Sequence, residues 1–270
     1  MRPPPPVSLG TGAAVIFRMQ VRRLVRSRKL RLGVVACALV VFAVVAARYA
    51  SLRDVGPDRA VELATEAIQS GFQWGFFKLL VFLLPFLLTS SAIAEEVEGR
   101  TLAFLTTRPV SRTAIALGKF TAGAAIALGL VVSSGLLLHF LGYATEPTAL
   151  FDSLGATLRV LGALTLLVFT YCSMCIFWGA LLPEAAGIVS ALYLAVVEFL
   201  AAGMPGLFRC VSMNYLAQQI AGFPPGGLMP EAAPSVPVHI GAPVIATVGL
   251  LFLVLAVITV QFSEYRFGKA

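Results

Sequence analysis

The stretch EGRTLAFLTTRPVSR, residues 98–112, is a polar segment between two of the longest apolar runs in the chain. Around it, the 270 residues are 59% hydrophobic and only 12% charged, with a mean hydropathy of +0.91. A soluble domain of this length carries about 25% charged residues. Lipid must therefore replace water around much of this chain, which argues against a soluble protein.

Six apolar runs are long enough to cross a bilayer of roughly 30 Å, which takes about 20 helical residues. In chain order, the predicted spans lie near 33–50, 72–94, 113–141, 155–182, 185–202 and 241–263. The sequence thus predicts an all-α integral membrane protein. A single six-span domain over 33–263 is flanked by a Pro-rich tail at 1–11 and a second tail at 264–270.

The basic residues are unevenly distributed along the chain. Eight of the 20 precede the first span: Arg2, Arg18, Arg22, Arg23, Arg26, Arg28, Lys29 and Arg31. Cytoplasmic segments carry an excess of Lys and Arg, so we expect the N-terminus in the cytoplasm. Six spans return the C-terminus to the same side. A net charge of +7 placed in this way indicates membrane topology rather than nucleic-acid binding.

Residues 12–32 are predicted to form an amphipathic helix. Its apolar side consists of Phe17, Val21, Leu24 and Val25, and its basic side of Arg18, Arg22, Arg26 and Lys29. Such a helix lies in the cytoplasmic headgroup layer with its cations toward anionic lipid. The alternative is that these charges serve only as a topology signal.

The segment 95–119 begins with carboxylates and ends with cations. Glu95, Glu96 and Glu98 follow the second span, and 101–107 can form about two helical turns whose apolar side carries Leu102, Phe104 and Leu105. Pro109 ends that helix, because its ring disfavours helical geometry in the preceding residue. Ser111 can then cap the next helix by accepting a backbone N–H bond. A short surface helix of this kind is suited to receive a push from a soluble partner.

This segment resembles the coupling region of the permeases of ABC-2 type ABC transporters. In that family a carboxylate cluster, a Gly–Thr–Leu core, a short apolar helix and Pro–Val–Ser–Arg follow the second span, and Ile-x-x-Gly-Lys opens the third. The matching residues are Glu98, Gly99, Thr101, Leu102, Leu105, Pro109, Val110, Ser111, Arg112, Ile115, Gly118 and Lys119. Arg100, between Gly99 and Thr101, departs from the pattern. The rest of the chain is similar in architecture, and 12–32 is similar to the family's elbow helix.

The resemblance implies a permease subunit of an ATP-driven exporter in a bacterial inner membrane. Two permease subunits, identical or different, would form the pathway, and a separate cytoplasmic ATPase dimer would bind ATP and Mg. The implied coupling residues are Glu95, Glu96, Glu98, Gly99, Thr101, Leu102, Phe104, Leu105, Arg108, Pro109, Ser111 and Arg112. We expect no cofactor on this chain, because the Gly118–Lys119 pair has Thr113 and Phe120 where a P-loop needs Gly and Ser or Thr.

Glu198 is the unusual residue of the fifth predicted span, because a carboxyl at membrane depth is costly. It shares a helix face with Gly187, Ala191 and Ala195, and small residues at this spacing mark a close helix contact. We therefore expect Glu198 to point into protein or into a cavity between subunits. It is either a pathway residue or a hydrogen-bonded packing residue.

Other polar groups in the spans receive simpler interpretations. Lys78 and His139 lie near outer ends of spans, where snorkelling to water accounts for both. Cys172 and Cys175 form a C-x-x-C pair inside an apolar run and are interpreted as core residues. No spacing of His, Cys, Asp and Glu predicts a metal site.

Two alternatives to a permease stay open. One is a membrane-embedded enzyme acting on lipid, which would use Glu95, Glu96 and Glu98 with Arg100 and Arg108. The missing metal-ligand spacing argues against it. The other is a non-transporting membrane anchor for an ATPase, which needs the same docking helix and cannot be distinguished by sequence. The transported substrate is equally beyond the sequence.

Overall fold

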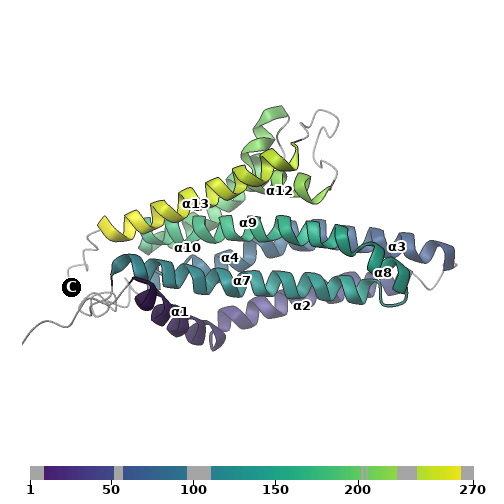
Figure 1. Cartoon of the computed structure of the whole chain (residues 1–270), viewed down its shortest axis with the longest axis horizontal. Helices are drawn as coiled ribbons and strands as arrows, with labels where there is room; N and C mark the ends of the chain where they lie inside the picture. The colour runs from purple at the N-terminus through teal and green to yellow at the C-terminus, as the bar shows by residue number, and fades with distance from the viewer. Residues whose placement is uncertain are drawn as a thin grey trace, which may run out of the picture.

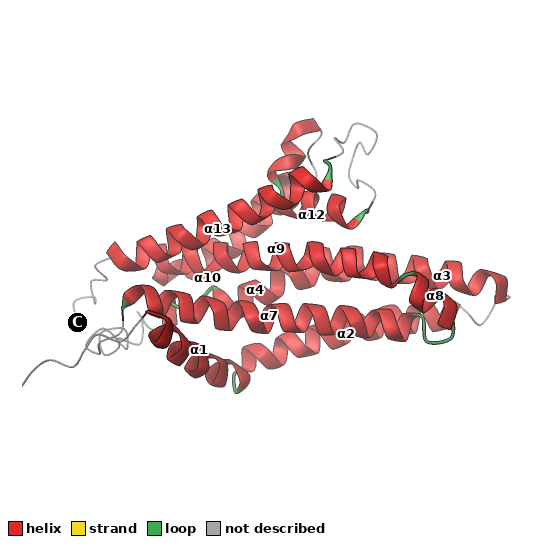
Figure 2. Ribbon diagram, in the orientation of Figure 1, coloured by secondary structure: helices red, strands yellow, loops and turns green. Residues whose placement is uncertain are grey.

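The computed structural model describes residues 9–51, 57–95, 111–201, 204, 206–223 and 236–262, and within these ranges the regular elements are all helices (Figures 1 and 2). The longer ones are α1 (Leu9–Val25), α2 (Arg28–Ser51), α3 (Pro57–Ser70), α7 (Arg112–Gly142), α9 (Leu154–Leu181) and α13 (Val238–Phe262). The shorter ones are η2 (Gly71–Leu80), α4 (Val81–Thr89), α8 (Pro147–Asp152), η3 (Pro183–Ala185), α10 (Ala186–Tyr193), η4 (Leu194–Leu200), η5 (Gly206–Val211) and α12 (Met213–Ala221).

Five helices in the described part of the chain are long and apolar enough to cross a membrane. They are Arg28–Ser51, Arg59–Thr89, Arg112–Gly142, Leu154–Leu181 and Val238–Phe262. The predicted span at 185–202 differs from them. Its helical run covers 186–201, about 24 Å at 1.5 Å per residue, which is shorter than a hydrocarbon core of roughly 30 Å. Its second half, η4, is a π-helix, which is wider and shorter per residue than an α-helix.

The predicted helix over 12–32 is divided in two. α1 ends at Val25, and Arg28, Lys29 and Arg31 belong to the first turn of α2. Ser27 makes the break, because its hydroxyl donates to the Leu24 carbonyl at 2.7 Å while its oxygen accepts from the Leu30 amide at 3.2 Å. Ser side chains compete with the backbone for hydrogen bonds in this way. Figure 1 shows α1 and α2 meeting at an angle.

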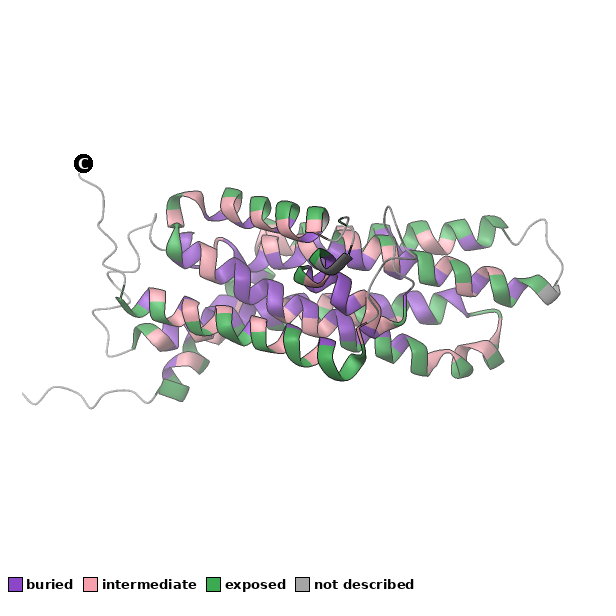
Figure 3. Ribbon diagram, turned by 90° about the horizontal axis from the view of Figure 1, so that it is seen from above, coloured by how far each residue is buried: buried purple, intermediate pink, exposed green. Residues whose placement is uncertain are grey.

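The core of the bundle is built around α9. This helix packs against α13, α7, α12, α4 and α10, and much of its surface is buried. Buried residues gather in the middle of the bundle (Figure 3). The outer helices α2 and α13 instead expose many apolar side chains, including Phe42, Leu250 and Val254. An exposed apolar surface of this kind is what a lipid-facing helix requires.

The two ends of the bundle are formed by different elements. The beginning of α1 and the end of α13 lie at one end, together with the beginning of α7, whereas α3 and α8 lie at the opposite end (Figure 1). We call these the termini end and the far end. At the far end, buried Arg48 donates to the Thr145 hydroxyl at 2.7 Å and thereby joins the end of α2 to the turn after α7.

Candidate functional site

Four polar side chains meet at the termini end, where α1, α2 and the turn after α4 come together. Arg23 donates to Glu95 Oε2 at 2.7 Å, and Lys29 is paired with Glu95 Oε1 and with the Ser91 hydroxyl. Ser91 donates to Glu95 Oε1 at 2.9 Å. We call this set, Arg23, Lys29, Ser91 and Glu95, the clasp. It joins both sides of the α1–α2 break to the chain that leaves α4.

The electrostatics of the clasp keep Glu95 ionised. Partial burial works to raise the pKa of this carboxyl, but the hydrogen bonds from Lys29 and Ser91 and the charges of Lys29 and Arg23 outweigh it and lower the pKa. The side chains are one third to one half exposed, so each ion pair contributes only a fraction of 1 kcal/mol to about 1 kcal/mol. Each contact of the clasp is therefore weak enough to open and re-form.

The beginning of α7 is tied to the same region. Ser111 is the N-cap of α7, and its side chain accepts a hydrogen bond from the Ala114 amide at 3.2 Å, which confirms the predicted cap. Arg112 donates to the Gln261 carbonyl at the end of α13 at 3.3 Å. Lys119 is buried and donates to the Ala92 carbonyl in the turn after α4. The polar segment between Glu95 and Ser111 thus begins and ends on helices that are bonded to each other.

The first helix lies against α7, with a buried side that differs from the predicted one. Its buried residues are Gly12, Ile16, Gln20 and Leu24, whereas Phe17 and Val21 are half-buried and Val25 is exposed. A Cβ on Gly118 of α7 would lie 2.8 Å from both the Ala13 carbonyl and the Ile16 Cβ. Gly118 therefore permits the close approach of the two helices, a role that the sequence did not suggest.

The predicted basic side of this helix is partly confirmed in position. Arg18, Arg22 and Arg26 are exposed, as expected for groups that face water or lipid headgroups. Lys29 differs, because it lies in α2 and is bound within the clasp. Arg23 joins the same carboxylate although it was not singled out. The sequence does contain an indication of this contact. Cations at 18–31 and carboxylates at 95–98 lie on two segments that are predicted to be on the same side of the membrane.

Most of the predicted coupling residues fall outside the described ranges. These are Glu96, Glu98, Gly99, Thr101, Leu102, Phe104, Leu105, Arg108 and Pro109. The short helix at 101–107 and its stop at Pro109 accordingly stay predictions. Of the coupling residues, Glu95, Ser111 and Arg112 are described. Glu95 and Arg112 each make a contact that links two elements, whereas Ser111 caps its own helix, α7.

Glu198 is buried and faces the N-terminus of α12. Its carboxylate accepts from the Ser212 hydroxyl at 2.7 Å, the Asn214 amide at 3.1 Å and the Met213 amide at 3.4 Å. A carboxylate at this position satisfies backbone N–H groups that lack helical partners and complements the helix dipole. Asn214 also donates to the Phe77 carbonyl at 3.0 Å, so α12 is bonded to both π-helical segments, η2 and η4.

The small residues of the fifth predicted span do not share the environment of Glu198. Ala191 and Ala195 are exposed and Gly187 is half-buried, whereas Glu198 is 1% exposed. The change of helical type at Leu194 rotates Glu198 away from the face that α-helical spacing predicts. Ala191 and Ala195 instead line a shallow apolar groove with residues of η2 and α4, among them Phe82 and Phe86.

His139 also departs from the prediction. It is fully buried between α7 and α9, and its ring nitrogens contact the Thr157 hydroxyl at 2.8 Å and the Leu150 carbonyl at 3.1 Å. Snorkelling to water therefore does not describe it.

These features define a membrane protein whose spans are joined at one end by a polar contact network. The comparison with known families agrees with this class: the model described as "ABC-2 family transporter protein" matches residues 14–270. The chain belongs to the ABC-2 family of transporter proteins, and so it is a multi-pass membrane component of an ABC transporter. No curated protein matches the chain in sequence.

Proposed function

We propose that this chain is the permease subunit of an ATP-driven exporter, with six membrane crossings and both termini in the cytoplasm. Two permease subunits form the pathway, and a separate ATPase dimer, which carries ATP and Mg, docks on the segment 95–112. The family supports the general part of this proposal, because ABC-2 proteins associate with ABC ATPases. The described structure supplies support for the coupling step.

The observation that carries the proposal is the clasp. Glu95 is the last described residue before the predicted docking helix, and it is bonded to Arg23 of α1 and Lys29 of α2. On the other side of that helix, Ser111 begins α7, and Lys119 of α7 returns to the Ala92 carbonyl. A force on the segment between them would reach α1, α2, α4 and α7 together, which is what a coupling element must achieve.

Three further observations support the separate ATPase, a structural rather than catalytic role of the clasp, and the orientation. Gly118 and Lys119 lie within α7 and are used for packing and for the Ala92 carbonyl rather than in a phosphate-binding loop. The clasp carboxylate is held ionised by two cations, which suits a structural contact better than a general acid. The cations of α1 and the first turn of α2 favour the cytoplasm for the termini end.

The test is purification of the tagged chain from its native host in mild detergent, with identification of partners by mass spectrometry. We expect a soluble P-loop ATPase to co-purify, and Leu102→Asp to abolish its recovery because a charge would enter the apolar docking side. Phe151→Asp is the matched control, since Phe151 is 72% exposed in α8 at the far end of the bundle. Equal ATPase recovery with all three proteins would refute docking on 95–112.

A further inference from the structure

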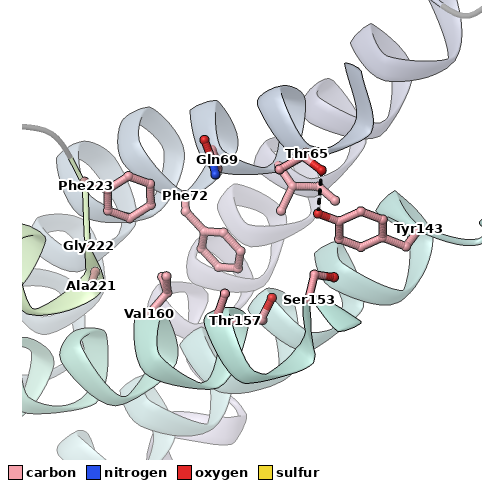
Figure 4. Close-up of a pocket in the computed structure, with 12 residues that line it drawn as sticks. Thr65, Gln69, Phe72, Tyr143, Ser153, Thr157, Val160, Ala221, Gly222 and Phe223 are labelled. Carbon is pink, nitrogen blue, oxygen red and sulfur yellow. Dashed lines mark hydrogen bonds between the residues drawn. The ribbon is translucent and has the colours of Figure 1, made fainter. Parts of the chain in front are cut away.

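The far end of the bundle contains a cavity of about 140 Å³ that the proposed coupling step does not use. A single water needs roughly 10–15 Å³ on the same measure, so the cavity has room for a larger ligand. It lies between α3, η2, the end of α7, α9 and the end of α12 (Figure 4). The polar residues that line it are Thr65, Gln69, Tyr143, Ser153 and Thr157, and the aromatic ones include Phe72 and Phe223. We call it the far-end pocket.

The hydroxyl protons around the far-end pocket are already used. Tyr143 donates to Thr65 Oγ1 at 3.1 Å, and Thr65 donates to the Val61 carbonyl at 2.9 Å. Ser153 donates to the Ala149 carbonyl at 2.6 Å. A hydroxyl has one proton but two acceptor lone pairs, so these oxygens keep acceptor capacity after their protons are engaged.

The hydroxyl proton of Thr157 is also engaged, in its case by His139. The Leu150 carbonyl can only accept, so His139 Nε2 carries the proton in the 3.1 Å contact between them. A fully buried imidazole in contact with a hydroxyl and a carbonyl is neutral, which leaves Nδ1 as an acceptor. Thr157 must then donate its proton to Nδ1 at 2.8 Å. Thr157 lines the pocket, and its oxygen keeps both lone pairs after this bond.

The wall thus offers four hydroxyl oxygens as acceptors, while the amide of Gln69 can act in either sense. The ring of Phe72 points between Gln69 and Thr157 in Figure 4, and an aromatic face attracts cations. Among the described side chains of α3, α8 and the adjoining ends of α2, α7 and α9, carboxylates outnumber cations by four to three. The carboxylates are Glu62, Glu66, Glu146 and Asp152, and the cations are Arg59, Arg159 and the buried Arg48.

We propose that the far-end pocket binds a primary ammonium group, which brings three N–H donors and a positive charge to a largely apolar wall that carries four hydroxyl oxygens and aromatic rings. The group belongs to a small amine or to the head group of an aminophospholipid. Arg159 reaches the rim beside Gly222, where a Cβ on that glycine would lie 3.9 Å from its guanidinium, and it is placed to meet a phosphate on the second kind of ligand. The site is independent of the ATPase-coupling proposal.

The experiment uses the purified full-length chain in phosphatidylcholine nanodiscs and isothermal titration calorimetry with ethylammonium chloride. Tetramethylammonium chloride is the matched probe, because it has the same charge and no N–H donor. We expect ethylammonium to bind at least tenfold more tightly than tetramethylammonium. Equal affinities, or no detectable heat with ethylammonium up to its solubility-limited concentration, would overturn the proposal.

Two variants locate the site. Tyr143→Phe and Ser153→Ala each remove one acceptor oxygen and keep the rest of the side chain, and together they should weaken ethylammonium binding at least tenfold. The matched control combines Tyr49→Phe with Ser133→Ala. Ser133 likewise donates to a carbonyl of its own helix, and neither residue lines the pocket. Thermal unfolding without ligand checks that both double variants are folded. Unchanged binding by the pocket variant would contradict the assignment.

The source of the ammonium group is decided with the same protein in nanodiscs that contain phosphatidylethanolamine. Competition, seen as weaker ethylammonium binding and as retained phosphatidylethanolamine in native mass spectrometry, supports the lipid head group. Unchanged ethylammonium affinity supports a soluble amine.

Discussion

Glu95 makes the contacts on which the coupling proposal depends, and its replacement gives a direct test at the scale of one residue. Glu95→Gln keeps the size of the side chain but removes the charge that Arg23 and Lys29 neutralise. We expect α1 to separate more often from the turn after α4 at a cost of about 1 kcal/mol, so that amides of α1 exchange with solvent roughly fivefold faster. Hydrogen–deuterium exchange measures this, with Glu184→Gln in the exposed turn after α9 as the control. Unchanged exchange in α1 would show that the clasp does not hold it.

The lowered pKa of Glu95 predicts how the clasp responds to pH. A carboxyl whose pKa falls on folding contributes stability above its unfolded value, near 4.3, and loses that contribution as the pH falls through the lowered native value. The exchange of α1 should therefore be constant from pH 7 to about pH 5 after correction for intrinsic rates. It should accelerate below about pH 4 in the wild type more than in Glu95→Gln. Parallel pH profiles would contradict this assignment.

Gly118 provides a test of the contact between α1 and α7. In Gly118→Ala the new methyl group would meet the Ala13 carbonyl and Ile16 at 2.8 Å, so α1 must move, at a cost of about 1–3 kcal/mol. Gly129→Ala on the same helix is the control, because no atom lies within 4 Å of its Cβ position. It should be neutral or stabilising by up to about 1 kcal/mol. Thermal unfolding in detergent compares the two, and equal shifts would contradict the close approach.

At the scale of elements, α12 depends on the carboxylate of Glu198. Glu198→Leu removes the acceptor of the Asn214 amide and the Ser212 hydroxyl, and a buried donor left without a partner costs about 1–3 kcal/mol. Glu198→Gln keeps one acceptor oxygen and should lose less than half as much in the free energy of unfolding. If the Gln variant folds normally but fails in transport, the charge itself is needed and Glu198 is a pathway residue.

The sequence predicts well those elements that depend on the membrane environment or on residues close by in the chain. Long apolar runs predict α7, α9 and α13, because a membrane span is apolar whether it faces lipid or the protein core. Ser111 predicts the start of α7, because a cap acts over three residues. The elements that it predicts poorly depend on distant partners. The π-helices η2 and η4 are bonded to α12, and the buried face of α1 depends on Gly118, more than 90 residues away in sequence. Hydrophobic periodicity carries no information about such contacts.

The same distinction applies to the residues of the candidate site. The charges of Arg18, Arg22 and Arg26 could be placed on an exposed face from helix geometry alone. Lys29 does not belong to the same helix, because Ser27 breaks the helix through the two hydrogen bonds of its own side chain. His139 was misjudged for a related reason: its burial depends on α9, and its position in the span says nothing about that neighbour.

For the whole molecule, the decisive question is whether the helical run at 186–201 crosses the membrane. The run is too short to count as a membrane span by length. However, it connects Glu184, next to the end of α9, with α12, which lies toward the far end in Figure 1. A crossing would put Glu184 in the cytoplasm and Val211 outside. The shortfall of about 6 Å against a roughly 30 Å core would require local thinning of the bilayer, at a modest cost.

Cysteine accessibility in intact cells tests this crossing and the orientation together. In a Cys210→Ser background, Val211→Cys and Phe151→Cys should react with a membrane-impermeant maleimide, because both side chains are exposed, at 55% and 72%. Glu184→Cys should react only after the membrane is permeabilised. The remaining cysteines, at 37, 172 and 175, are buried and should stay unlabelled. Labelling of Glu184→Cys and Val211→Cys under the same condition would mean that 186–201 does not cross, leaving five spans and the C-terminus opposite the N-terminus.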